Sequence, residues 1–378
     1  MSVMGEPNYG AWVAQRGAGF GGNLTIVDVV LPDMLHMVDA YWYQFPPITP
    51  LWHGILGFMM VVLGIISVVG NGMVIYIFCS TKSLRTPSNF LVVNLAFSDF
   101  CMMVTMAPPT ILNCYYQTWV LGSLFCEIYG MFGSIFGCGS IWTMVFIAMD
   151  RYNVIVKGLS AKPLTKTTVL FWIFLIWGMA SIWTAAPLFG WNRYVPEGSL
   201  TACGTDYLSG NTMDISYLIV YGSFCYVLPL LSISYFYFFI VRTVAAHEKS
   251  MRDQAKKMNV ASLRSSENAA KSSEYKLAKI ALMTITLWFM AWTPYMATNL
   301  AGILGSTKIN PLSGIWCSIL AKANAVYNPI VYAISHPRYR LALEKKFPSL
   351  VCGAVHDDTV STATGVTNCI EDDKTTTI

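Results

Sequence analysis

The stretch TTVLFWIFLIWGMASIWTAAPLFGW, residues 167–191, contains no charged side chain. An α-helix needs about 20 mainly apolar residues to cross the ~30 Å hydrocarbon core of a membrane, so this stretch is long enough to span one. Six further stretches are long and apolar enough to do the same, near residues 52–79, 89–113, 123–150, 215–241, 277–304 and 311–334. Such spans must be helical because lipid offers no partners for backbone polar groups. The sequence therefore predicts an all-α membrane protein, a bundle of seven transmembrane helices.

The composition of the 378 residues supports the membrane class. Hydrophobic residues make up 55% of the chain and charged residues 12%, against about 25% charged residues in ordinary globular domains. So few charges cannot cover the surface of a water-soluble fold of this size. The net charge of +4 is too small to imply nucleic acid as a partner. The ten cysteines include no CxxC or Cys/His spacing typical of a metal site, so no metal is expected.

The positions of the 24 lysine and arginine residues predict how the chain lies in the membrane. Twenty of them fall in the loops and tail on one side, whereas Arg16, Arg193 and Lys308 fall on the other. Cytoplasmic loops of membrane proteins carry the excess of positive charge. The amino terminus is therefore predicted to be extracellular and the carboxyl terminus cytoplasmic. The N-x-[ST] sequon at Asn23 lies on the predicted outer side and is a candidate glycosylation site.

Four segments follow from this pattern. They are an extracellular segment (1–50), the seven-helix bundle (51–335), a short amphipathic helix on the inner membrane surface (336–348) and a disordered cytoplasmic tail (349–378). Tyr339, Leu343 and Phe347 repeat at helical spacing between basic residues, which is typical of a helix lying on a membrane. The polar loop 247–274 is expected to continue the fifth and sixth helices inward. The tail is rich in threonine and acidic residues, a composition that does not bury a core.

Lys322 is the most informative single residue because it falls in the middle of the last apolar stretch. An ammonium group at that depth costs about 2.5–3.5 kcal/mol on insertion scales. It could be paired with a buried acid such as Asp99, or it could face a water-filled cavity. It could also form a Schiff base with an aldehyde, the chemistry that lysine supplies to carbonyl compounds. Its position alone leaves these alternatives open.

Five short motifs are distributed over the predicted spans, one in each of the first, second, third, sixth and seventh. They are Asn71 in the first span, Leu95-Ala96-Phe97-Ser98-Asp99 in the second, Asp150-Arg151-Tyr152 closing the third, Trp292-Thr293-Pro294 in the sixth, and Asn328-Pro329-Ile330-Val331-Tyr332 closing the seventh. From about residue 50 to 350 the chain resembles the rhodopsin-like G-protein-coupled receptors. Lys322, six residues before Asn328, stands where opsins carry their retinal-binding lysine. The resemblance implies a protonated Schiff base to 11-cis-retinal or a hydroxylated retinal.

The resemblance also implies a counterion and a disulfide. Vertebrate visual opsins carry a glutamate three residues after a cysteine that opens the third helix, but here Cys126 is followed at that distance by Tyr129. Glu197 in the second outer loop matches the glutamate that serves invertebrate opsins as counterion, with Tyr129 expected as a hydrogen-bonding neighbour. The alternative for Glu197 is a solvated loop carboxylate. The family pairs Cys126 with Cys203 of the same loop.

Two further groups of residues take roles from the resemblance. Trp292 and Tyr295 are expected to face the chromophore, and Gly133 and Gly137 give the third helix a thin face there. The residues expected to act in G-protein activation are Asp150, Arg151, Tyr152, Asn328, Pro329, Tyr332, His247, Glu248 and Lys249. In the resting state Asp150 is expected to pair with Arg151.

Two stretches suggest a subclass. His247-Glu248-Lys249 resembles a tripeptide of invertebrate visual opsins, and residues 190–198 resemble the arthropod long-wavelength group. Such opsins are visual photoreceptors of photoreceptor membranes that couple to a Gq-type G protein and phospholipase C. No substrate is consumed, so the chain is expected not to be an enzyme. The alternatives are a retinal photoisomerase, a receptor for a diffusible ligand and a light-driven ion pump.

The tail carries weaker signals. Its threonines and Ser361 are candidates for a receptor kinase, and the added charge would recruit arrestin. Cys352 follows the surface helix and is a candidate for palmitoylation. Thr376-Thr377-Ile378 fits the carboxyl-terminal pattern that adds a strand to a PDZ scaffold.

Overall fold

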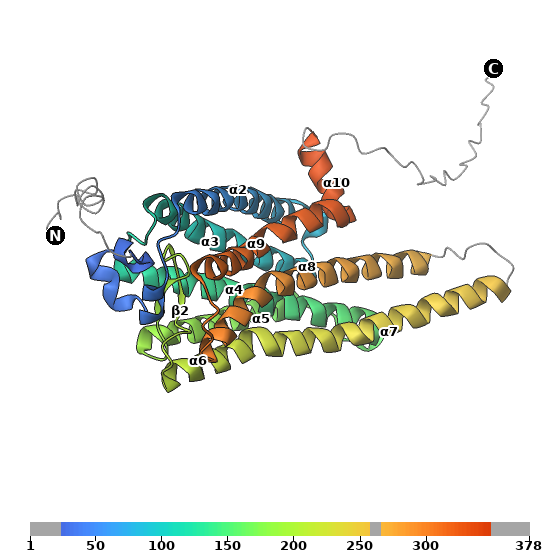
Figure 1. Ribbon diagram of the computed structural model, residues 1–378. Helices are drawn as coiled ribbons and strands as arrows, with labels where there is room; N and C mark the ends of the chain where they lie inside the picture. The colour runs from blue at the N-terminus through green and yellow to red at the C-terminus, as the bar shows by residue number, and fades with distance from the viewer. Residues whose placement is uncertain (1–23, 258–265, 349–378) are drawn as a thin grey trace, which may run out of the picture.

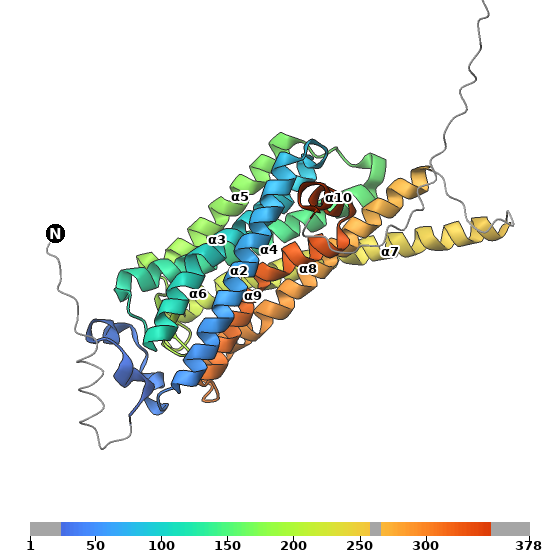
Figure 2. The same ribbon diagram turned by 90° about the horizontal axis from the view of Figure 1, so that it is seen from above.

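The computed structural model describes residues 24–257 and 266–348 (Figure 1). Long helical rods run side by side, and a shorter helix, α10 (Pro337–Lys346), lies at an angle to them at one end (Figures 1 and 2). In chain order the rods are α2 (Pro50–Ser80), α3 (Pro87–Tyr116), α4 (Gly122–Tyr152), α5 (Lys166–Ala185), the continuous rod α6 (Thr212–Gly222), η8 (Ser223–Val227) and α7 (Leu228–Lys257), α8 (Ser266–Ile303) and α9 (Pro311–Ser335). Short helical turns between the rods are η4 (Lys82–Leu84), η5 (Asn153–Lys157), η6 (Gly158–Ser160) and η7 (Ala186–Phe189).

Proline marks the start of several helices and bends others. The first residues of α2, α3, α9 and α10 are Pro50, Pro87, Pro311 and Pro337. At that position the missing N–H would have had no partner in the helix, and the ring presets the helical φ angle. Pro294 and Pro329 instead lie inside α8 and α9, where each removes one backbone hydrogen bond. Packing against neighbouring helices makes such breaks tolerable in a membrane.

Six helices of the described part are long and apolar enough to cross a membrane. They are Pro50–Ser80, Pro87–Tyr116, Gly122–Ser160, Lys166–Phe189, Thr212–His247 and Tyr275–Ile303. The seventh rod, α9, is 25 residues long. Lys322, Asn324 and Asn328 lie in its middle and lower its mean hydropathy. It packs against α2, α3 and α8 within the bundle, so these polar side chains face protein and not lipid.

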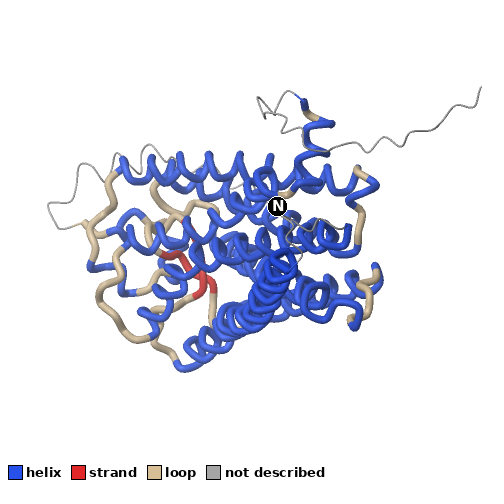
Figure 3. Tube along the Cα trace, turned by 90° about the vertical axis from the view of Figure 1, so that its right-hand side faces the viewer, coloured by secondary structure: helices blue, strands red, loops and turns tan. Residues whose placement is uncertain are grey.

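A two-stranded hairpin lies among the helices near one end of the bundle (Figure 3). Strand β1 (Tyr194–Glu197) pairs antiparallel with β2 (Ala202–Thr205), and Glu197 stands opposite Ala202. All eight residues of the two strands are buried. A disulfide joins Cys203 of β2 to Cys126 at the start of α4, and it fixes the hairpin to the bundle.

The segment before α2 lies on the hairpin side of the bundle (Figure 1). It folds into three short turns, η1 (Ile26–Val29), η2 (Pro32–Met37) and η3 (Ala40–Gln44). Trp42 of η3 is 1% exposed and belongs to the same buried cluster as Cys203. The Tyr41 hydroxyl donates a hydrogen bond of 2.6 Å to the carbonyl oxygen of Ile309, between α8 and α9. The segment is therefore part of the folded chain.

The all-α bundle predicted from hydropathy is the observed fold, with helix ends mostly within a few residues of the expected ones. The larger differences are at the predicted inner end, where α7 runs to Lys257 and α8 begins at Ser266. Hydropathy locates only the apolar part of a helix and therefore does not show these polar extensions. The expectation that the two helices continue came from the composition of the loop. Asn23, Cys352, Thr376–Ile378 and the rest of the tail lie outside the described residues.

Candidate functional site

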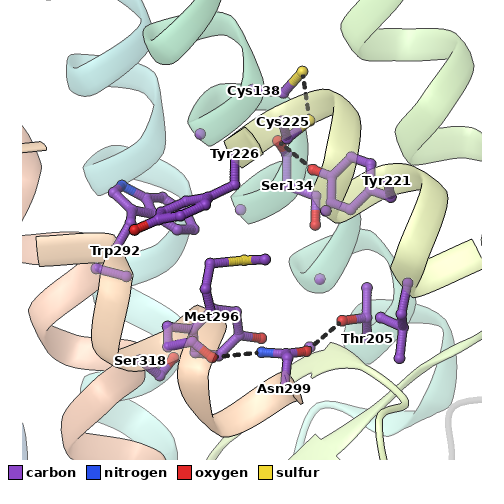
Figure 4. A pocket seen from close by; sticks show the side chains of 18 of the residues that line it. Ser134, Cys138, Thr205, Tyr221, Cys225, Tyr226, Trp292, Met296, Asn299 and Ser318 are labelled. Atoms are coloured by element: carbon purple, nitrogen blue, oxygen red, sulfur yellow. Dashed lines mark hydrogen bonds between the residues drawn. The ribbon is translucent and has the colours of Figure 1, made fainter. Parts of the chain in front are cut away.

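A cavity of about 500 Å³ lies between α3, α4, the α6–η8 segment, α8, α9 and the hairpin (Figure 4). Its volume is that of a site for a small organic ligand, typically about 300–1,000 Å³. Most of its wall is apolar or aromatic, with Met106, Tyr226, Trp292 and Met296 among the lining residues. Lys322 and Glu197 also line it. The cavity therefore combines an apolar body with a few charged and polar groups.

Lys322 projects from α9 into this cavity and is 6% exposed. Its Nζ atom donates a hydrogen bond of 2.6 Å to the Ser318 hydroxyl, one helical turn earlier. In the described part of the chain it forms no ion pair. Asp99, the acid considered from sequence as its partner, accepts hydrogen bonds from Ser140 at 2.9 Å and from Asn328 at 2.6 Å. The structure thus separates Lys322 from Asp99 and leaves its amine facing the cavity.

Glu197 ends strand β1 and is 3% exposed, so it is not a solvated loop carboxylate. The Tyr295 hydroxyl donates a hydrogen bond of 3.0 Å to its Oε2 atom. The Ser318 hydroxyl that accepts from Lys322 also lies near this carboxylate and favours its charged form, so one serine lies beside both the base and the acid. Burial raises the pKa of Glu197 above its usual value, and the positive charge of Lys322 opposes that rise.

Tyr129 lies beside Lys322, but its hydroxyl does not form the hydrogen bond to the site that the sequence led us to expect. Its hydroxyl is 2.7 Å from the Thr110 hydroxyl of α3, with which it shares a hydrogen bond. The face of its ring, and not its hydroxyl, approaches Lys322, with Nζ 5.8 Å from the ring centroid. A cation at that distance is attracted by the negative face of the ring. The expected hydrogen bond to the site is therefore replaced by a cation–π contact.

Trp292 forms one wall of the cavity, and a glycine makes room for it. A Cβ atom on Gly137 of α4 would lie 2.7 Å from the Trp292 ring, which is closer than carbon atoms pack. Trp292 stacks on Trp288 with ring centroids 5.3 Å apart and meets Tyr295 edge-on at 6.2 Å. Gly133, one turn before Gly137, leaves the same kind of space for the Met106 side chain.

Gly137→Ala is expected to lower the stability of the protein because the added methyl group clashes with Trp292. Overpacking of this kind costs about 1–3 kcal/mol. The measurement is the Tm of the purified variant, followed by a fluorescence reporter of unfolding. The control is Gly178→Ala in α5, where an added Cβ meets nothing within 4 Å. Alanine favours a helix over glycine, so the control keeps or raises the Tm. An unchanged Tm for Gly137→Ala would contradict the contact.

Sequence reasoning missed two residues of the site. Ser318, which lies beside both Lys322 and Glu197, stands four residues before Lys322, a spacing that places both on one helix face. Gly204 follows Cys203 in β2, and a Cβ there would lie 2.6 Å from both Glu197 Oε2 and the Tyr295 hydroxyl. The helical spacing could have revealed Ser318. Gly204 could not be found without knowing the hairpin register.

A second group of residues lies at the other end of the bundle from the hairpin. Arg151 is buried and forms an ion pair with the neighbouring Asp150 at the end of α4. The Tyr152 ring packs on Phe236 of α7, with centroids 5.4 Å apart. The buried positive charge of Arg151 is thus compensated by the neighbouring carboxylate, the pairing expected from the sequence.

The other residues assigned to activation lie on α7 and α9. Asn328 donates to Asp99, and Pro329 follows it inside α9. The Tyr332 ring meets the His336 ring edge-on at 6.4 Å. His247 contacts Tyr275 at 5.8 Å between ring centroids, which brings the inner extensions of α7 and α8 together. Glu248 and Lys249 follow His247 in α7.

Comparison with known proteins agrees with this arrangement. A family model described as 7 transmembrane receptor (rhodopsin family) matches residues 70–332. The chain belongs to this family. The rhodopsin of Sphodromantis sp. is 64% identical over 374 residues, which cover 99% of both chains. The long-wavelength rhodopsin of Apis mellifera is 61% identical over 375 residues, again covering 99% of both chains.

The fold of this rhodopsin-family receptor is also similar to the crystal structure of squid rhodopsin. The TM-score is 0.77 at 34% sequence identity, covering 83% of this chain and 91% of the squid chain. These relatives place the chain among arthropod visual opsins, as the motifs predicted. It is therefore a multi-pass membrane receptor and not an enzyme, and its family acts on heterotrimeric G proteins.

Proposed function

We propose that this opsin is a visual photoreceptor that holds 11-cis-retinal, or a hydroxylated retinal, covalently on Lys322 and activates a Gq-type G protein when illuminated. The observation that carries the proposal is the buried Lys322 amine, which faces an apolar cavity of about 500 Å³ with Glu197 beside it. A receptor for a diffusible ligand has no general need for a lysine in the middle of a membrane span, where its charge costs free energy. The rhodopsin names of the relatives support the same chromophore.

The residues of the cavity fit such a group. An aldehyde needs one nucleophilic amine, and Lys322 supplies it without an ion pair to break. A polyene needs a narrow apolar space, and Gly133 and Gly137 let the Met106 and Trp292 side chains that line the cavity pack closely against α4. When bound, retinal supplies absorption of visible light and a change of shape from the 11-cis to the all-trans form. The cavity lining therefore fits both the aldehyde and the polyene of retinal.

Glu197 is proposed to neutralise the positive charge at the Lys322 nitrogen. An isolated charge in an apolar cavity is strongly unfavourable, so the nitrogen keeps its proton only if an anion lies near. Ser318 accepts a hydrogen bond from Lys322 and lies near Glu197, so its hydroxyl is placed to interact with both groups. Tyr295 fixes the carboxylate by its own hydrogen bond. These contacts favour the protonated form of the Lys322 nitrogen.

Trp292 and Arg151 are proposed to connect the cavity to the G protein. Trp292 lines the cavity and precedes Pro294, the residue that interrupts the hydrogen bonds of α8. A change in the position of its ring would alter the tilt of α8 around that break. At the far end Arg151 is paired with Asp150, and light is proposed to change the contacts of this guanidinium so that it engages the G protein. In this proposal Trp292 at the cavity and Arg151 at the far end of the bundle change together between a resting and an active arrangement, and light favours the active one.

The remaining proposals concern orientation and partners. An extracellular amino terminus follows from the lysine and arginine count, which places twenty of the 24 positive residues on the cytoplasmic side or in the tail. Gq coupling rests on the similarity to arthropod long-wavelength rhodopsins. A receptor kinase and arrestin are proposed for the tail threonines, and a PDZ scaffold for Thr376–Ile378.

Arg151→Ala tests the G-protein part of the proposal. The variant is expected to form pigment with retinal as the wild type does, because Arg151 lies far from the cavity. Light-stimulated nucleotide exchange on purified Gq should fall to the dark level, because the guanidinium proposed to engage the G protein has been removed. The control is Lys308→Ala, which removes an exposed positive residue on the outer side.

Three results would contradict parts of this account. Normal exchange by Arg151→Ala would exclude the proposed role of the arginine. Normal pigment in the wild type without light-stimulated exchange on Gq or Gi would favour the alternative of a retinal photoisomerase. Exchange on Gi alone would keep the photoreceptor and exclude the Gq assignment.

A further inference from the structure

Two thiols face each other in the wall of the cavity (Figure 4). Cys138 of α4 and Cys225 of η8 lie with their Sγ atoms 3.1 Å apart. Cys138 is buried at 2% exposure, Cys225 is half-buried, and both line the cavity. In the described residues no second pair of free thiols is in such contact. Neither cysteine has a role in the proposed function.

The geometry suits a bond between them. A disulfide has a length of about 2.0 Å, so the two sulfurs need to approach by about 1 Å. The two residues are 87 positions apart in the chain, so the bond would join α4 to the fifth rod directly.

We propose that Cys138 and Cys225 form a redox-sensitive dithiol that hydrogen peroxide converts to a disulfide in the ligand-free receptor. Hydrogen peroxide is small and uncharged, so it is suited to reach thiols that line a mainly apolar cavity. Cys225 is the more accessible of the two and reacts first, and Cys138 is the resolving thiol beside it. A ligand that fills the cavity covers both sulfurs, so the reaction is a property of the empty receptor.

The chemistry balances in two steps. The thiolate of Cys225 attacks one oxygen of hydrogen peroxide, forms an S–O bond, breaks the O–O bond and releases hydroxide. The thiolate of Cys138 then attacks this sulfur, forms the S–S bond and releases a second hydroxide. The two thiol protons convert the two hydroxides to water. The thiols lose two electrons, and the peroxide gains them.

The test uses the full chain, purified in detergent without retinal, so its outcome does not depend on the chromophore. After peroxide treatment the free thiols are alkylated, and peptides are mapped by mass spectrometry. A linked Cys138–Cys225 peptide pair is expected, lighter by two hydrogens than the separate peptides and released by dithiothreitol. Its yield should rise from neutral to alkaline pH, because the thiolate is the nucleophile.

Two variants give the matched controls. Cys225→Ser should leave Cys138 free to be alkylated after peroxide treatment. Cys317→Ser, which removes a half-buried free thiol of α9, should keep the Cys138–Cys225 link. The proposal is overturned if both cysteines of the wild type stay fully alkylated under conditions that oxidise the exposed Cys79. Because the wild-type map alone decides this, poor folding of a variant would not affect the result.

Discussion

Lys322→Ala is expected to abolish the visible pigment completely. The only amine that lines the described cavity is removed, so retinal has no group with which to form a covalent bond. The variant should still fold, because loss of a charge at this depth favours membrane insertion by about 2.5–3.5 kcal/mol. The measurement is the absorbance of purified protein after incubation with 11-cis-retinal in the dark. Size-exclusion chromatography on the same sample reports whether the protein is folded.

Ser318→Ala is the matched control for this variant. It removes the hydrogen bond to the Lys322 amine but keeps the amine itself, so a visible band should remain with a changed position. A visible band in Lys322→Ala would show that retinal is held elsewhere. Folded wild type without any visible band would return Lys322 to the role of an ordinary buried lysine.

Glu197→Gln is expected to move the visible band of the pigment to the near-ultraviolet at neutral pH. The substitution keeps the size of the side chain and its contact with Tyr295 but removes the negative charge. Removing one partner of a buried charge pair costs about 3–5 kcal/mol. Since 1.36 kcal/mol corresponds to a tenfold change in proton affinity, the pH at which the visible form is lost should fall by about 2 to 4.

The measurement is a pH titration of the pigment spectrum in the dark. Acidification should restore the visible band, because excess protons compensate for the weaker affinity of the nitrogen. Glu197→Asp keeps the charge and should keep a visible band at neutral pH. Glu127→Gln, a second glutamate near the outer end of α4, should have no effect. An unchanged titration in Glu197→Gln would exclude Glu197 as the counterion.

Much of the fold follows from the sequence because lipid imposes a simple rule. Apolar stretches longer than about 20 residues must be helices, and their ends can be located to within a few residues. The exceptions are α7 and α8, whose inner turns are polar and project beyond the apolar region. Polar helical turns that lie beyond the membrane lack a long apolar run. The composition of the loop could therefore indicate that the helices extend, but not where they end.

The site is predicted less completely, because contacts between distant segments leave no local pattern. Lys322 is conspicuous in sequence, since a charge is costly in lipid and demands a reason. Glu197 is identified by the resemblance, but its burial depends on the hairpin register and on the disulfide that fixes the hairpin. The hydroxyl of Tyr129 bonds to Thr110 of the neighbouring helix, a contact that depends on how α3 and α4 pack. Cys138 and Cys225 meet for the same kind of reason.

The central claim is that Lys322 holds a light-sensitive retinal in this cavity. The most direct measurement is the absorption spectrum of the purified full chain with 11-cis-retinal, recorded in the dark and again after illumination. We predict a visible band in the dark that shifts on illumination, as the protonated nitrogen and Glu197 require. Folded protein that shows only the near-ultraviolet absorption of free retinal, with no change in light, would contradict the account.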